Sequence, residues 1–115
     1  MFKIGDIIYA YPHRAGCSEY VTFAVVEKVT PLGRIRIREI GKITKNPPKR
    51  VLGELLPISI RCKVVPNPLE RATITYTLNK EGERIEGSHG SWAYFEKYTE
   101  DLELYDVTDV TDFGD

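Results

Sequence analysis

The sequence has little of what marks secreted, membrane-spanning or disulfide-stapled proteins. It contains two cysteines, too few for a disulfide scaffold. Its start has no charged segment leading into an apolar stretch of the signal-peptide kind. The longest apolar run there, 7–11, is well short of the ~20 residues that cross a bilayer. We therefore expect an intracellular, cytoplasmic protein with no membrane partner.

Residues suited to metal binding or nucleophilic catalysis are equally scarce. His13 and Cys17 are spaced as one pair of zinc ligands can be, but Cys62 and His89 lack the paired spacing of a second half-site. Nothing in the sequence marks either cysteine as activated. We expect no catalytic residues, no metal and no small-molecule cofactor, and hence a protein that is not an enzyme.

Net charge is also nearly absent. Sixteen Lys and Arg residues face 17 Asp and Glu, which gives a formal charge of -1 and excludes a polycation held to nucleic acid by bulk charge. With 115 residues, of which 42% are hydrophobic, the chain is long enough for one core but too short for a two-domain enzyme. We expect one domain over 1–106 and a flexible acidic tail over 107–115, where Val-Thr-Asp repeats.

Gly and Pro recur throughout and leave little room for long helices. Between them lie short segments rich in Ile, Val, Thr and Tyr with a period of two, which is typical of strands. The sequence predicts an all-β fold of six to seven short antiparallel strands, closed as a small barrel or a compact sandwich. The expected strands are 3–11, 20–29, 34–40, 56–65, 71–78, 84–86 and 102–106.

Two turns, one regularly alternating segment and two less regular segments complete this prediction. A Pro-Gly turn at 30–33 joins two strands into a hairpin, and a second turn falls at 79–82. Alternation over 72–78 predicts a buried face of Ala, Ile, Tyr and Leu opposite a wet face of Thr. The segment 91–98 fits either a helical turn or a strand, and 42–53 is expected to be an exposed loop.

Charge is strongly separated along the chain. Residues 34–63 carry nine basic and two acidic side chains, a net charge of +7, whereas 96–115 carry one basic and eight acidic side chains, a net charge of -7. The basic strip predicts a binding site for an anionic partner, although a solvated strand face explains it too. The tail is either disordered, folded back on the strip, or in contact with the strip of a neighbouring copy. The candidate strip consists of Arg34, Arg36, Arg38, Lys42, Lys45, Lys49 and Arg50.

The start of the chain resembles SH3-like small barrels, including Tudor-like and KOW-type modules. The resemblance rests on Gly5-Asp6 leading into the first strand and on the bent hairpin over 23–37. The whole chain also resembles short proteins of bacteriophages and large DNA viruses. The first resemblance implies a non-catalytic binding module, and the second an accessory or minor structural protein of a virion or infected cell. The aromatic residues considered for contacts are Tyr9, Tyr11, Trp92 and Tyr94.

A Tudor-like cage would need three or four rings around one pocket, and core packing explains these aromatic residues more simply. Our functional hypothesis is therefore a non-enzymatic binding or assembly module that uses the strip to bind an acidic protein partner or a neighbouring copy. The alternative is a nucleic-acid-binding module that its own acidic tail inhibits.

Overall fold

The computed structural model describes residues 1–15, 18–45, 59–83, 85 and 94–109; the side chains of 11–15, 18, 59–60 and 108–109 are not described. The all-β prediction is confirmed: the described residues contain six strands and no helix. Among them, no helix has the length and apolar character that crossing a membrane requires. The strands are β1 (Ile7–Ala15), β2 (Ser18–Val29), β3 (Ile35–Lys45), β4 (Ser59–Leu78), β5 (Phe95–Lys97) and β6 (Leu104–Asp109).

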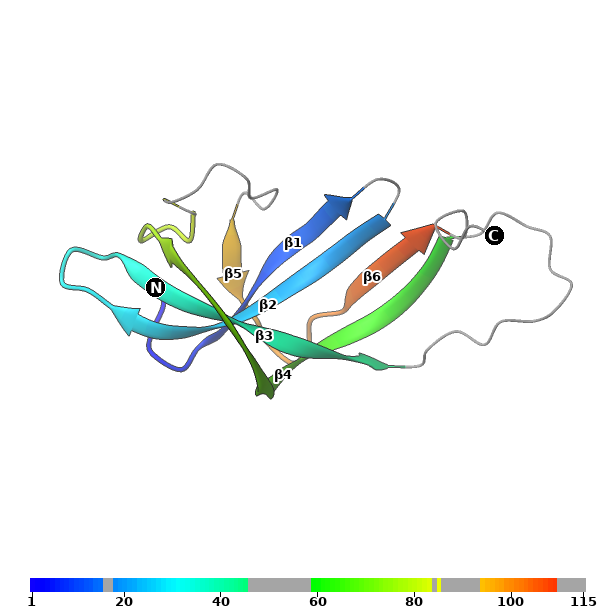
Figure 1. Ribbon diagram of the computed structural model, residues 1–115, viewed down its shortest axis with the longest axis horizontal. Coiled ribbons are helices and arrows are strands. Elements are labelled where there is room, and N and C mark those ends of the chain that lie inside the picture. The colour runs from blue at the N-terminus through cyan, green and yellow to red at the C-terminus, as the bar shows by residue number, and fades with distance from the viewer. Residues whose placement is uncertain (16–17, 46–58, 84, 86–93, 110–115) are drawn as a thin grey trace, which may run out of the picture.

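All six strands belong to one antiparallel sheet with the order β3-β4-β6-β2-β1-β5, and β3 also pairs with β2 (Figure 1). The pairings β2–β3, β3–β4, β4–β6 and β6–β2 therefore form a closed circuit. The last of these is a single pair, Glu19 with Val107. β2 takes part in three pairings and is the centre of the sheet.

The β2–β3 hairpin forms where the sequence predicts it. The amide of Gly33 donates to the carbonyl of Thr30 over 2.9 Å, and Thr30 donates to Arg34 over 2.8 Å. Gly33 has a φ of 88°, the left-handed conformation that Gly adopts without a steric penalty. The turn sets the register in which Val26 faces Ile37.

β4 replaces the two separate strands expected at 56–65 and 71–78. It runs for 20 residues and bends across the sheet, from the side of β6 to the N-terminal half of β3 (Figure 1). Gly41 pairs with Asn67 and Ile40 with Arg71, so 68–70 bulge out of the ladder. The bulge keeps Pro68, which has no amide proton, out of the pairing, and the strand continues on either side.

Hydrophobic side chains form two clusters on opposite faces of β2, since successive residues of a strand point to opposite sides. This arrangement explains why β2 carries an almost continuous apolar run over 21–26, as expected of a strand covered on both faces. One cluster contains Ile8, Ala10, Ala24, Val26, Ile35, Ile37, Leu78 and Phe95. The other contains Tyr9, Val21, Phe23, Val25, Ile40 and Val64.

Other segments differ from the prediction in detail. The first residues of the expected loop, 42–45, continue β3 and pair with 63–66, while the rest of it, 46–53, lies outside the described residues. The ambiguous segment resolves at Phe95–Lys97 as the strand β5. β6 extends to Asp109, three residues into the expected tail, and 110–115 lie outside the description.

The second turn also forms as expected. Gly82 donates to the carbonyl of Asn79 over 3.0 Å and has a φ of 91°. Of the short strand expected at 84–86, only Ile85 is described, and it lies outside the strands. Ile74 departs from the predicted buried face of 72–78, since it is 51% exposed, whereas Leu78 on the same face is fully buried. Ile74 lies in a second irregularity of the β3–β4 ladder, where 72–74 fall between the pairs Arg38–Thr75 and Ile40–Arg71.

Candidate functional site

The predicted basic strip is divided along β3 into cations with different surroundings. Arg34 lies exposed in the turn before β3, and Arg36 is exposed on the strand. Arg38 and Lys42 are half-buried and ion-paired, whereas Lys45 is exposed at the end of β3. The remaining two residues of the strip, Lys49 and Arg50, lie outside the described residues.

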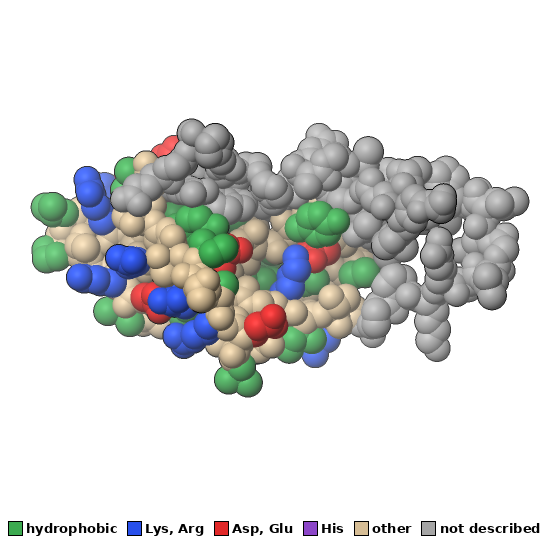
Figure 2. Space-filling view, viewed as in Figure 1, with side chains coloured by type: hydrophobic (Ala, Val, Ile, Leu, Met, Phe, Trp, Pro, Cys, Tyr) green, Lys and Arg blue, Asp and Glu red, His purple; other side chains and the backbone are tan. Residues whose placement is uncertain are grey.

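Arg36 and Arg38 share one face of β3 because they lie two residues apart, about 6.6 Å along the strand. Their direct partners on β4 are Thr77 and Thr75. Since residues of one parity share a strand face, Arg71 extends the same face along β4. Lys and Arg side chains gather over this half of the molecule, at the left in Figure 2. We call the surface formed by Arg36, Arg38 and Arg71 the arginine face.

One glutamate is ion-paired with the arginine face. Glu27 of β2 accepts a hydrogen bond from Nε of Arg38 over 2.8 Å. This hydrogen bond, reinforced by the charges of Arg38, Arg71 and Arg36, lowers the pKa of Glu27 below its ordinary value. The same hydrogen bond raises the pKa of Arg38. The arginine face therefore holds a carboxylate in its ionised form.

Most N–H donors on this face have no protein partner within the described part of the chain. Nη1 of Arg38 donates to the carbonyl of Ala72 over 2.9 Å, and Nη2 of Arg36 to Oγ1 of Thr75 over 3.3 Å. Nε of Arg71 donates to Pro68 over 3.4 Å. With five donors on each guanidinium, these bonds and that to Glu27 use four of fifteen. The face can thus donate further hydrogen bonds to an anion.

Lys42 has a different role, because it spans a gap in the sheet. β2 and β3 stay paired as far as Phe23 and Ile40 and then separate. Nζ of Lys42 crosses the opening, donates to the carbonyl of Val21 over 3.0 Å and pairs with Asp106 of β6. Lys42 thereby joins the separated strands.

Asp106 completes this connection between three strands. Its carboxylate also accepts the amide proton of Val21 over 2.8 Å, and its side chain is only 14% exposed. One acidic residue of 96–115 therefore contacts the basic strip of its own chain. Sequence reasoning counted Asp106 among the acidic charges but not among the site residues, because the pairing of β4 with β6 that places it there is non-local.

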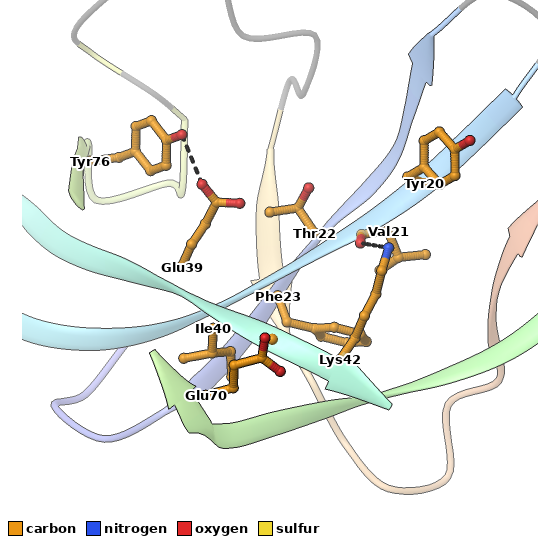
Figure 3. A pocket seen from close by; sticks show the side chains of 10 residues that line it. Tyr20, Val21, Thr22, Phe23, Glu39, Ile40, Lys42, Glu70 and Tyr76 are labelled. Carbon is orange, nitrogen blue, oxygen red and sulfur yellow. Dashed lines mark hydrogen bonds between the residues drawn. The ribbon is translucent and has the colours of Figure 1, made fainter. Parts of the chain in front are cut away.

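A pocket of about 500 Å³ opens where β2 and β3 separate (Figure 3). Its apolar lining comes from Val21, Phe23 and Ile40, which are buried. Its polar lining comes from β2, β3 and β4 and consists of Tyr20, Thr22, Glu39, Lys42, Glu70 and Tyr76. Sequence reasoning did not find this pocket, since it depends on the divergence of two strands and on the bulge in β4.

The other end of the basic segment carries a second group of cations. Lys45 faces Lys63 directly across the β3–β4 ladder. The guanidinium of Arg61 lies 4.6 Å from the ring centroid of Tyr105, a cation–π contact. These side chains lie on the β6 side of the sheet, away from the arginine face.

The aromatic candidates do not form a cage within the described residues. Tyr9 is 6% exposed in a core cluster, and its hydroxyl donates to Glu96 over 3.0 Å. Tyr94 is 48% exposed. The side chains of Tyr11 and Trp92 lie outside the description.

Four residues were considered as zinc ligands: His13, Cys17, Cys62 and His89. Of their side chains, only that of Cys62 is described, and it is a half-buried free thiol. No group of three or more His, Cys, Asp or Glu suited to a metal ion occurs among the residues that the structure describes. No protein-family model, curated protein or solved structure matches the chain. The resemblances to SH3-like barrels and to viral proteins therefore stay predictions.

Proposed function

We propose that the protein is a non-catalytic binding module whose arginine face binds an acidic segment of a protein partner. The observation that carries this proposal is the placement of Arg36, Arg38 and Arg71 on one face of β3 and β4, where Arg38 pairs with Glu27. Arg38 already donates to a carboxylate here, and most of the remaining donors are available to others. Guanidinium groups bind carboxylates well because their N–H donors match the two carboxylate oxygens.

The extent of the face favours an acidic peptide over a nucleic acid. The three arginines and Glu27 together have a net charge of +2, and Lys28, the direct partner of Arg36 on β2, adds one cation beside them. Proteins that bind duplex DNA through phosphates often make 6–10 such contacts, which need a longer track of free cations. The next described cation of the strip on this face of β3, Lys42, is paired with Asp106 instead.

The experiment measures binding of a fluorescein-labelled peptide of alternating Asp and Ser by fluorescence anisotropy at low salt. The double variant Arg36→Gln/Arg71→Gln should weaken binding about tenfold, since each exposed charge pair contributes roughly 0.5–1 kcal/mol. Raising NaCl from about 0.05 M to about 0.5 M should weaken binding to the unmodified protein, because salt screens exposed charges.

The matched control is Arg61→Gln/Lys63→Gln, which removes the same charge on the β6 side of the sheet and should leave the affinity within twofold. An equal loss in this control would show that binding follows net charge and not the arginine face. A single-stranded oligonucleotide of the same charge serves as the competing ligand. Tighter binding of the oligonucleotide than of the peptide would overturn the proposal in favour of nucleic acid.

A further inference from the structure

The pocket between β2 and β3 contains two carboxylates with no cationic partner among the described residues. Glu39 accepts a hydrogen bond from the hydroxyl of Tyr76 over 2.9 Å, and Glu70 reaches in from the bulge of β4 (Figure 3). By contrast, Glu27, Asp106 and Asp6 are each paired with a Lys or Arg. The pocket thus has negative charge that the described fold does not neutralise.

The bulge and a glycine together bring Glu70 to the pocket. A Cβ atom added to Gly41 would clash with Oε2 of Glu70 and lie 2.6 Å from its Cδ. Such distances are far below van der Waals contact, so the carboxylate lies directly over the backbone of Gly41. Any larger residue at position 41 would force the Glu70 side chain to move.

The pocket already holds one ammonium group at its other end. The Lys42 stem lies along the lining, and its Nζ is 5.5 Å from the ring centroid of Tyr20 and hydrogen-bonded to Val21 (Figure 3). The same kind of environment, an apolar wall with an aromatic ring and a carboxylate, is repeated beside Glu39 and Glu70. A second alkyl stem could pack on the half-buried ring of Tyr76, beside the nearly buried Ile40, and carry a cation to these carboxylates.

We propose that this pocket binds the lysine or arginine side chain of a partner protein, with Glu39 and Glu70 receiving the cationic head. This inference goes beyond the binding of an acidic segment at the arginine face and does not depend on it. An open pocket of about 500 Å³ accommodates a single long side chain. Both carboxylates line this pocket, the half-buried Glu39 and the exposed Glu70, so a head group with several N–H donors has two acceptor groups there.

The test uses Nα-acetyl-arginine amide and Nα-acetyl-lysine amide as probes, with uncharged Nα-acetyl-citrulline amide as the matched control. Amide chemical shifts of the full-length protein report both the affinity and the place of binding. At least one cationic probe should bind at millimolar concentration and shift the amides of 20–23 and 39–42, and citrulline should bind at least tenfold more weakly. Whichever cation binds more tightly identifies the head group.

Isosteric variants then test the carboxylates. Glu39→Gln and Glu70→Gln should each weaken binding of the cationic probe at least threefold, whereas Glu103→Gln, an exposed glutamate outside the pocket, should have no effect. Gly41→Ala keeps both carboxylates but displaces Glu70, and should weaken binding as Glu70→Gln does. The amide spectrum of each variant shows that it is folded, and the two glutamine variants decide the matter if Gly41→Ala is unfolded.

The proposal is overturned if citrulline binds as tightly as arginine and lysine, if Glu103→Gln weakens binding as much as the pocket variants, or if the shifts lie elsewhere. Acidic-peptide binding is measured on the same variants. Because it should not change in Glu39→Gln or Glu70→Gln, failure of the pocket proposal is distinguishable from failure of the arginine-face proposal.

Discussion

Two ion pairs tie cations of β3 to acids of other strands, and their surroundings differ. Arg38 pairs with Glu27 over 2.8 Å across the β2–β3 hairpin, on a face with two further arginines. Lys42 pairs with Asp106 of β6, far away in the sequence, inside the gap between β2 and β3. The exposed fractions of the two cations are similar, 29% and 31%, but those of the acids are 27% and 14%.

The difference shows which cations of the basic strip can serve a partner. Asp106 also accepts the amide proton of Val21. Loss of its charge would leave Lys42 without its anionic partner in the gap. The Lys42–Asp106 pair is thus part of the fold. Glu27 lies among more positive charge than it neutralises, so the carboxylate of a partner can add to it or replace it.

The largest expected effect follows from breaking the pair in the gap. Asp106→Asn retains an acceptor for the Val21 amide but leaves the ammonium of Lys42 unpaired. We expect a loss of about 2 kcal/mol in the free energy of unfolding, measured by urea denaturation, because a partly buried charge loses its partner. Glu27→Gln on the open face should cost clearly less, since exposed ion pairs contribute little.

A second substitution separates the charge effect from a packing effect. Adding Lys42→Met to Asp106→Asn removes the unpaired ammonium and should recover much of the loss, because an apolar side chain needs no partner in the gap. If Asp106→Asn lowers the free energy of unfolding no more than Glu27→Gln does, the two ion pairs contribute equally to stability, and the proposed difference between them is wrong.

A smaller effect is expected on binding at the arginine face. Glu27→Gln raises the net charge of the face from +2 to +3 and should tighten binding of the acidic peptide about threefold at low salt. Lys42→Gln removes a cation of the same predicted strip, yet should change the affinity less than twofold. Anisotropy titrations check both. If Lys42→Gln weakens binding as much as the arginine variants do, the binding site includes Lys42 and is not confined to the arginine face.

Local sequence patterns were sufficient to predict the parts of the fold that depend on neighbouring residues. The turn at 30–33 follows from Pro and Gly at positions where a turn needs them. The alternation of 72–78, extended by one residue toward the N-terminus, also places Arg71 on the wet face with the threonines. This signal was present in the sequence, although Arg71 was not among the candidate residues.

The pocket and the Lys42–Asp106 pair could not be predicted in the same way, because both depend on register between distant strands. Pro66 and Pro68 indicated a break between two strands, whereas a bulge at 68–70 lets β4 continue and brings Glu70 over Gly41. Asp106 reaches the gap only because β6 pairs with both β4 and β2. Local sequence patterns do not predict which distant strands pair.

The smallest expected effect is a change in the pKa of Glu27. Its measurement tests whether nearby cations, and not a hydrogen bond from a neutral donor, keep this carboxylate ionised. Its pKa lies below its ordinary value of 4.5, first through the hydrogen bond from Arg38 and then through arginine charges. The pKa of Asp101 is also lowered, but by hydrogen bonds from Thr99 and from its own backbone. Folding lowers the pKa of both groups. Both carboxylates therefore stabilise the folded protein at a pH above their ordinary pKa values, and this contribution is lost as the pH falls through the lowered pKa values.

Titration of the side-chain carboxyl carbons by NMR should therefore place both groups below their ordinary ranges. At about 1 M NaCl, where the screening length falls to about 3 Å, the pKa of Glu27 should rise toward 4.5 while that of Asp101 changes little. The double variant Arg36→Gln/Arg71→Gln should raise the pKa of Glu27 at low salt, since it removes two of the contributing charges. Equal responses of Glu27 and Asp101 to salt would contradict the assignment of Glu27 to a cationic face, because hydrogen bonds from neutral donors are not screened in this way.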